Sequence, residues 1–362
     1  MFAKRVLGFL TAAAVFLVGT IFIFPQKADA VTTSASAAIL MCADNGMILY
    51  EHHSHEKRAI ASITKIMTAV IALEQDEDKE VKFTLDMAAE GTSMYLKENE
   101  VLKLSELTKG MMMVSGNDAA NAIAVSIAGS REKFAELMNQ KAEQLGMTDT
   151  HFVTPSGLDD EQHYSTAYDM AVLCRYAMRN PNFQNIVSQS SINVSYVYPK
   201  GKMQTCKNHN RLVSMYEGCI GIKTGYTSKA GRTLTSCAER NDVRLIAVTL
   251  NDRDDWNDHM ALYDYGWKCV EKKTVIPADK RFYVPVVGSE STVVRVVPEH
   301  SCFAVLFKDS DESIDEKIYL PRFLYAPIHT GQAVGEINCY KQGVLIAHTR
   351  LIAAENVNYG VP

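Results

Sequence analysis

The chain has 362 residues, of which 47% are hydrophobic and 22% are charged, a balance typical of a globular protein with a buried core. This composition excludes collagen-like, low-complexity and wholly disordered chains. The formal net charge is −5, and no basic run is long enough to hold a polyanion, so nucleic acid is not an expected partner.

The first thirty residues differ in character from the rest of the chain. A Lys-Arg pair at positions 4 and 5 precedes an apolar run over residues 6–24, and an Ala-Asp-Ala sequence ends at Ala30. This order predicts that residues 1–30 are a signal peptide cleaved after Ala30. An uncleaved anchor is the alternative, because the apolar run is close to the length of a membrane span. In both cases an exported, extracytoplasmic protein is expected, with membrane contact only through this segment if it is uncleaved.

The cysteines and histidines give weaker signals. Eight cysteines lie beyond residue 30, and none forms a Cys-x-x-Cys pair. An even number in an exported protein permits disulfides, but the scattered spacing is equally consistent with buried free thiols, which we favour. The histidines at positions 52, 53 and 55 lie in a polar segment and are interpreted as solvated surface, so no metal site is expected there.

The first half of the remaining chain is predicted to be mainly helical. Asn45-Gly46 between two apolar runs predicts a hairpin over residues 38–51, because both residues tolerate a positive φ. An apolar stripe at helical spacing predicts a helix over residues 62–74. Further helices are expected over residues 105–113, 118–128, 130–145 and 165–179.

From residue 219 onward the pattern changes to that of strands. Short apolar and β-branched runs predict strands over residues 219–226, 232–238 and 243–250, and a helix is expected over residues 256–268. After residue 273 only strand-like runs follow, over residues 282–287, 292–297, 302–307, 333–340 and 343–353. A mixed α/β domain over residues 31–272 and a β-rich domain over residues 273–362 are therefore predicted.

The helix predicted from residue 62 begins with a Ser-x-x-Lys sequence. Residues i and i+3 share a helix face, so the Lys65 amine would lie within hydrogen-bond reach of the Ser62 hydroxyl. A lysine whose pKa is lowered by burial or a nearby cation can take the hydroxyl proton and make the serine a nucleophile. For this pair alone, an N-capping serine followed by a surface lysine is an equally open interpretation.

Two further motifs accompany this pair. Residues 115–117, Ser-Gly-Asn, lie in a break between two predicted helices, and residues 223–225, Lys-Thr-Gly, lie on a predicted strand. The lysine and threonine of the second motif offer a cation and a hydroxyl to a carboxylate, and its glycine leaves room for a peptide along the strand. Each motif is weak alone, but their order and their placement on a helix, a helix break and a strand favour one shared site.

The three motifs give the sequence a specific resemblance to a known family. With residues 61–68, 114–120, 163–169 and 221–227, it resembles the low-molecular-mass penicillin-binding proteins that act as serine-type D-Ala-D-Ala carboxypeptidases. The resemblance extends from about residue 37 to the C-terminus. It implies a β-lactamase/transpeptidase-like α/β (α+β) fold, in which helices flank an antiparallel sheet, followed by a small all-β domain. It implies no metal and no organic cofactor.

The resemblance also implies the catalytic residues. Ser62 would be the acylated nucleophile, Lys65 the base that activates it, and Ser115 the group that relays a proton to the leaving D-alanine. The expected reaction is removal of the terminal D-alanine from the stem pentapeptide of peptidoglycan. β-Lactam antibiotics, which mimic this peptide end, would acylate the same serine.

The implied substrate-binding residues come from the second and third motifs. Asn117 would hold an amide of the substrate, and Lys223 and Thr224 would bind the terminal carboxylate. Gly225 gives the peptide room, and the backbone N–H of Tyr226 would complete an oxyanion hole with that of the nucleophile.

Some features depart from the family pattern. Relatives often carry arginine in the Asn-x-Asn turn that precedes Lys-Thr-Gly, where this chain has His209. If this side chain holds the carboxylate, binding would be weaker or would depend on pH, since histidine titrates near neutrality. Many relatives also end in an amphipathic membrane-binding helix, and none is expected here.

Three other functions are alternatives to a D-Ala-D-Ala carboxypeptidase. A class A β-lactamase would need a Glu-x-x-Leu-Asn loop, which the sequence lacks. A non-catalytic module that binds wall peptide or penicillin would be expected to lose Ser62, Lys65 or Lys223, and all three are present. An endopeptidase or transpeptidase acting on the same D-Ala bond stays open, because the choice of acceptor leaves little trace in a sequence.

Overall fold

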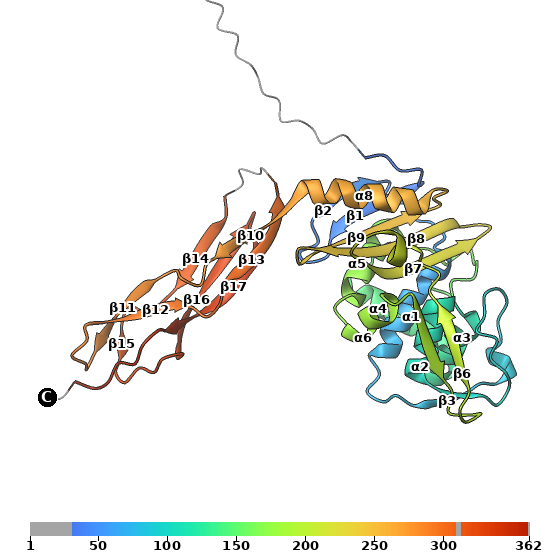
Figure 1. The fold of residues 1–362 in the computed structure, drawn as a ribbon, viewed down its shortest axis with the longest axis horizontal. Helices are drawn as coiled ribbons and strands as arrows, with labels where there is room; N and C mark the ends of the chain where they lie inside the picture. Colours follow the sequence, from blue (N-terminus) through green and yellow to red (C-terminus); the bar gives the residue numbers. More distant parts are fainter. Residues whose placement is uncertain (1–30, 309–312, 361–362) are drawn as a thin grey trace, which may run out of the picture. The chain divides into compact units, whose positions relative to one another are not determined.

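The computed structural model describes residues 31–308 and 313–360 (Figure 1). The predicted signal peptide, residues 1–30, lies outside the described residues. Within the described ranges, no helix combines the length and the apolar character needed to cross a membrane.

A five-stranded antiparallel sheet in the order β2-β1-β9-β8-β7 forms the centre of the first domain. Its strands are β1 (Ala37–Cys42), β2 (Ile48–His52), β7 (Cys219–Thr227), β8 (Gly231–Arg240) and β9 (Val243–Leu250). The predicted first hairpin is confirmed, and the Asn45 side chain accepts a hydrogen bond from the Met47 backbone N–H in its turn. Strand β9 pairs with β1 in the middle of the sheet, so strands from the beginning and the end of this domain lie side by side.

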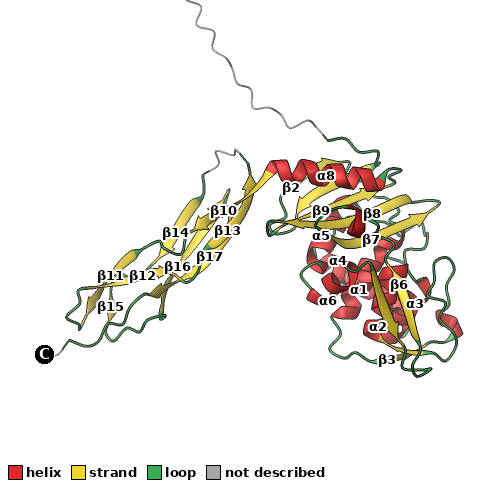
Figure 2. Cartoon of the chain, viewed as in Figure 1, coloured by secondary structure: helices red, strands yellow, loops and turns green. Residues whose placement is uncertain are grey.

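Helices cover both faces of this sheet, as predicted (Figures 1 and 2). They are η1 (Ala61–Thr64), α1 (Lys65–Leu73), η2 (Leu85–Met87), α2 (Leu104–Val114), α3 (Asn117–Ala128), α4 (Arg131–Gln144), α5 (Ala167–Ala177), α6 (Pro181–Val187), α7 (Leu212–Met215) and α8 (Asp255–Cys269). The helix predicted from residue 62 begins as a 3₁₀ turn and becomes α-helical at Lys65. The short helices η2, α6 and α7 were not predicted.

Two short antiparallel strand pairs complete this domain and were also not predicted. They pair β3 (Glu80–Lys82) with β4 (Val101–Lys103), and β5 (Ser191–Ser195) with β6 (Met203–Lys207). Each of these strands has only three to five residues, too few for an alternating pattern to be distinguished from chance in the sequence.

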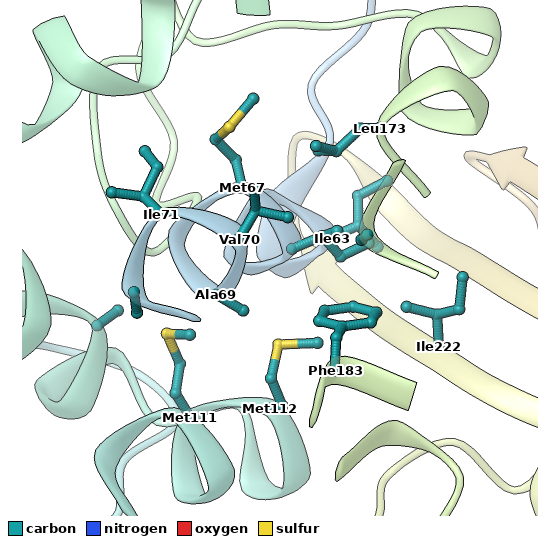
Figure 3. Packing of buried hydrophobic residues seen from close by; sticks show 14 of the residues in the cluster. Ile63, Met67, Ala69, Val70, Ile71, Met111, Met112, Leu173, Phe183 and Ile222 are labelled. Atoms are coloured by element: carbon teal, nitrogen blue, oxygen red, sulfur yellow. The ribbon is translucent and has the colours of Figure 1, made fainter. Parts of the chain in front are cut away.

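Strand alternation divides the buried residues between the two faces. Ile39 and Val248 belong to the core on the α1 side, whereas Leu40 and Leu245 pack with α8. Helix α1 is surrounded by apolar side chains, and Figure 3 shows Leu173 of α5 on one side of it and Met112 of α2 and Phe183 of α6 on another. Each such buried side chain stabilises the fold by about 1.5–3 kcal/mol. This packing fixes the start of α1 against the sheet edge.

The second part of the chain is all β, as predicted. Its strands are β10 (Val270–Ile276), β11 (Phe282–Val287), β12 (Val293–Pro298), β13 (Cys302–Phe307), β14 (Asp315–Tyr319), β15 (Leu324–Tyr325), β16 (Ala333–Lys341) and β17 (Val344–Ala353). They form a six-stranded sheet in the order β14-β16-β17-β12-β11-β15 and a β10-β13 pair. The boundary predicted between residues 272 and 273 falls inside β10, which follows α8 directly.

The cysteines are free thiols, as we favoured from their spacing. All eight are unpaired, and six of them are buried. Burial raises the pKa of the Cys42 and Cys219 thiols to about 11, so these groups stay protonated and pack as small apolar side chains.

Candidate active site

Ser62 and Lys65 lie together at the junction of η1 and α1. Lys65 Nζ is 2.8 Å from Ser62 Oγ and donates a hydrogen bond to the Ser156 backbone carbonyl at 2.7 Å. The lysine side chain is fully buried, which lowers its pKa well below the ordinary value, and the nearby Lys223 amine lowers it further. The amine can therefore lose its proton and accept one from the serine hydroxyl.

The backbone that precedes the serine has an uncommon conformation. Ala61 has a φ of 48°, in the left-handed region, and its carbonyl packs against Gly157. A Cβ at Gly157, whose own φ is +83°, would lie 1.9 Å from the Ala61 oxygen, so this position requires glycine. On the other side, the Thr233 hydroxyl of β8 donates to the Ile60 carbonyl at 3.0 Å. The backbone next to Ser62 is thus held by contacts from both directions.

Ser115 lies in the break between α2 and α3, where the sequence predicted it. Its φ of 61° and ψ of 32° are left-handed, and it is 5% exposed. A non-glycine residue in this region is uncommon and is often found at functional sites. Ser115 lines the same cavity as Ser62.

Asn117, the third residue of that motif, is directed differently. Its Nδ2 donates to the Glu90 carbonyl at 2.6 Å, and its backbone N–H donates to the Thr92 carbonyl at 2.7 Å. The side-chain Oδ1 is buried and has no hydrogen-bond partner. Asn117 therefore holds the segment around Gly91 close to the site but is not among the residues that line the cavity.

Asp118 was not predicted as a site residue and organises the same segment. Its carboxylate accepts hydrogen bonds from the Ser93 hydroxyl at 2.6 Å and from the Met94 and Leu96 backbone N–H groups at 2.8 and 3.0 Å. These contacts fix a loop from which Thr92 reaches the cavity. The aspartate resembles an ordinary first-turn helix residue in the sequence, so only the fold reveals this function.

The Lys-Thr-Gly motif lies on β7, at the edge of the sheet. Lys223 is 1% exposed, its Nζ donates to the Thr224 carbonyl at 2.9 Å, and burial lowers its pKa to about 7. A Cβ at Gly225 would lie 2.9 Å from the Ser62 backbone nitrogen and 2.4 Å from Thr233 Oγ1. The absence of a side chain at this glycine allows the β7 backbone to approach the Ser62 backbone.

A cavity of about 490 Å³ brings these elements together. Its lining residues are Ser62, Thr92, Ser115, His209, Thr224, Gly225, Tyr226, Arg232, Asp255 and Trp256. Five of the eight predicted site residues line the cavity, namely Ser62, Ser115, Thr224, Gly225 and Tyr226, and a sixth, Lys65, is hydrogen-bonded to Ser62. Lys223 is buried and donates a hydrogen bond to the Thr224 carbonyl, and Asn117 holds the loop that contains Glu90.

His163 is a further buried residue, and no individual role was predicted for it. Its Nδ1 accepts hydrogen bonds from the Val153 and Thr154 backbone N–H groups at 3.0 and 3.3 Å, so the proton of the neutral ring is on Nε2, 2.8 Å from Thr64 Oγ1. Burial lowers its pKa to about 4. The ring thereby joins η1 to the segment that carries Ser156, the acceptor for the catalytic-motif lysine.

Comparison with known proteins agrees with this geometry. The family model of peptidase S11, described as D-alanyl-D-alanine carboxypeptidase, matches residues 25–254. The chain belongs to this family. The C-terminal domain of penicillin-binding protein 5 matches residues 271–359, so the all-β part of this carboxypeptidase-family chain also has a counterpart in the family. The resemblance inferred from the motifs is confirmed.

Individual relatives span nearly the whole chain. D-alanyl-D-alanine carboxypeptidase DacC of Escherichia coli is 33% identical over 97% of this chain and 92% of its own length. DacF of Bacillus subtilis, with the same description, is 30% identical over 92% of this chain and 88% of its own. Among solved structures, penicillin-binding protein 5 from Haemophilus influenzae superimposes with a TM-score of 0.67 at 26% identity, covering 91% of this chain and 99% of that one.

Proposed function

We propose that the protein is a serine-type D-Ala-D-Ala carboxypeptidase that removes the terminal D-alanine from peptidoglycan stem pentapeptides through an acyl-enzyme on Ser62. The observation that carries this proposal is the 2.8 Å contact between Ser62 Oγ and the fully buried amine of Lys65. Membership of the carboxypeptidase family supports the class of reaction.

Acylation begins with proton transfer from Ser62 to Lys65. The Ser62 oxygen then attacks the carbonyl carbon of the penultimate D-alanine, and the backbone N–H groups of Ser62 and Tyr226 stabilise the negative oxygen of the tetrahedral intermediate. The proton held by Lys65 is relayed through Ser115, which donates its own hydroxyl proton to the nitrogen of the departing D-alanine as the peptide bond breaks and takes up the one from Lys65. Water subsequently hydrolyses the ester and restores the free serine.

Substrate binding involves both sides of the cavity. Lys223 and Thr224 bind the terminal carboxylate, so a preference for substrates with a free C-terminus is expected, and Gly225 leaves room for the peptide beside β7. The unpartnered Oδ1 of Asn117 supports its assignment as an acceptor for a substrate amide. β-Lactams, which carry the corresponding carboxylate and a reactive amide, are expected to acylate Ser62.

The remaining proposals concern the organisation and location of the chain. We assign residues 1–30 as a signal peptide, residues 31–272 as the catalytic domain and residues 273–362 as a separate C-terminal domain. The protein would then act outside the cytoplasm, at the cell wall or the outer face of the membrane, where its substrate is found.

The first experiment is mass spectrometry of a soluble pentapeptide ending in D-Ala-D-Ala, incubated with the mature protein and with Ser62→Ala. Loss of one alanine with the wild type alone is expected. Cross-linked peptide dimers would instead indicate a transpeptidase. An unchanged peptide together with a covalent penicillin adduct on Ser62 would mean that the serine reacts but the natural substrate differs. Absence of both reactions would leave a binding module.

A further inference from the structure

The cavity continues beyond the predicted motifs, past β7 and toward the start of α8. Arg232 of β8 is directly opposite Tyr226 of β7 in the antiparallel register, and Thr224 is opposite Leu234. Arg232 and Thr224 are therefore diagonal neighbours that point to the same face of the sheet, a separation that a long side chain can span. Both line the cavity that contains Ser62.

A buried carboxylate fixes the orientation of this arginine. Arg232 Nε and Nη2 donate to the two oxygens of Asp255 at 3.1 and 2.5 Å, and the guanidinium lies 5.6 Å from the Trp256 ring centroid. The Asp255 side chain is 3% exposed, whereas that of Arg232 is 43% exposed. A guanidinium has five N–H donors, so those on Nη1 are left for a ligand in the cavity. Asp255 thus orients the donors without using all of them.

Arg232 also differs from the other basic groups of the site in its charge. Burial lowers the pKa of Lys65, of Lys223 and of His209, so each of these side chains can be neutral near pH 7. The pKa of Arg232 is raised by its hydrogen bonds to Asp255. Among the residues that line the cavity, Arg232 is the one with a permanent positive charge.

We infer that Arg232, oriented by Asp255, recognises the terminal carboxylate of the acyl donor beside Thr224, and that His209 does not supply this charge. The inference rests on the proposed function. It explains how the chain dispenses with an arginine in the Asn-x-Asn turn: a cation from the neighbouring strand reaches the same cavity. Free acids should then be preferred over otherwise identical neutral ligands.

The test compares two matched substrates, a pentapeptide ending in D-Ala-D-Ala and the same peptide with a C-terminal amide. The ratio of their kcat/KM values should be about 10- to 100-fold lower in Arg232→Gln than in the wild type, because a charged hydrogen bond is lost only with the acid. Arg232→Lys should lose part of the ratio. The acylation rates of benzylpenicillin and its methyl ester, followed by intact mass, provide the same ratio without peptide turnover.

Three control variants separate recognition from folding. Arg244→Gln removes an arginine that pairs with Glu239 outside the cavity and should leave the ratio unchanged. The double variant Arg232→Gln, Asp255→Asn avoids an unpaired buried carboxylate and should show the same low ratio as the single variant. His209→Ala should retain the wild-type ratio.

Two results would overturn the inference. One is an unchanged acid-to-amide ratio in both Arg232 variants, and the other is a ratio that falls in His209→Ala and not in Arg232→Gln. A wild-type protein that releases no D-alanine would contradict the proposed function instead, while the penicillin and ester pair would still report on Arg232. The two failures are therefore distinguishable.

Discussion

The two faces of the five-stranded sheet bury polar groups in opposite ways. On the α1 face, the amines of Lys65 and Lys223 are both buried; burial lowers the pKa of each, and the nearby Lys223 amine lowers that of Lys65 further. On the α8 face, the Ser236 hydroxyl lies 2.6 Å from both His259 Nδ1 and the Tyr263 hydroxyl, and His259 Nε2 lies 3.0 Å from Thr249 Oγ1.

The buried polar groups of the α8 face stabilise the fold, whereas those of the α1 face are suited to proton transfer. The α8 network is neutral and each of its members has a partner, so it joins the helix to the sheet at little electrostatic cost. The two lysines pay a desolvation cost, and no carboxylate of the described residues lies within hydrogen-bond distance of either amine, but the same burial lowers their pKa toward the range that a general base requires. The buried polar groups of the α1 face are therefore expected to contribute less to the stability of the protein than those of the α8 face.

The largest effect is expected for Lys65→Met, which removes the amine and keeps most of its volume. The rate of D-alanine release should fall by about 10²–10⁴-fold, because proton transfer from Ser62 loses its base. The free energy of unfolding, measured by urea denaturation, should be unchanged or higher, since a buried amine is replaced by an apolar side chain. A strong loss of stability would contradict the proposed contrast between the two faces.

A loss of about 100-fold in kcat/KM is expected for Gly225→Ala. The new methyl group would lie 2.4 Å from Thr233 Oγ1 and 2.9 Å from the Ser62 nitrogen, so β7 must move away from the nucleophile. Combining it with Thr233→Ala should recover part of the activity, because the closer clash is removed. Steady-state kinetics of the single and double variants checks this, and wild-type kinetics in the single variant would disprove the close approach.

On the α8 face, His259→Gln should reduce stability without reducing the activity of the folded protein. Its loss at pH 7 should be about 1–3 kcal/mol, the cost of disturbing a buried hydrogen-bond network. Burial lowers the pKa of His259 from 6.5 to about 3. Below pH 6.5 the unfolded chain therefore binds a proton that the folded chain does not, and wild-type stability should fall as the pH decreases toward 3.

The same denaturation series at several pH values provides the control for this variant. His259→Gln should show a shallower loss of stability on acidification than the wild type. His163, whose pKa is lowered to about 4, should account for much of the acid dependence that remains. Equal slopes in the variant and the wild type would be inconsistent with a neutral, buried His259.

The smallest effect concerns the pH dependence of kcat/KM. Lys223 has a pKa of about 7 in the free enzyme, so its positive charge is lost as the pH rises through this value. A decline of about tenfold or less is expected above pH 7, because Arg232 remains charged. In Arg232→Gln the decline should be steeper. A profile that is flat from pH 7 to 9 in both proteins would argue against a lysine contribution to carboxylate binding.

Elements defined by contacts between nearby residues could be predicted from the sequence, and those defined by long-range contacts could not. Helix α1 and the β1–β2 hairpin were predicted because their signals, an apolar stripe and an Asn-Gly turn, lie within a few residues. The short pairs β3–β4 and β5–β6 were missed because strands of three to five half-exposed residues leave no such signal.

For the site, motif order indicated which residues meet but not how each is supported. Ser62, Ser115 and Thr224 line one cavity, as their motifs suggested. The Ser156 carbonyl that contacts Lys65 gave no signal, because any residue type carries a backbone carbonyl. Arg232 was missed because it lies on a different strand from the Lys-Thr-Gly motif and reaches the cavity through cross-strand register.

The sequence by itself determined the family, the order of helices and strands, and the residue types available for chemistry, since these depend on local patterns and on motifs that can be read along the chain. Tertiary structure alone decided the lowered pKa values of Lys65 and Lys223, the direction of the Asn117 amide and the entry of Arg232 into the cavity. Burial and register set these properties, and both arise only when segments far apart in the sequence pack together.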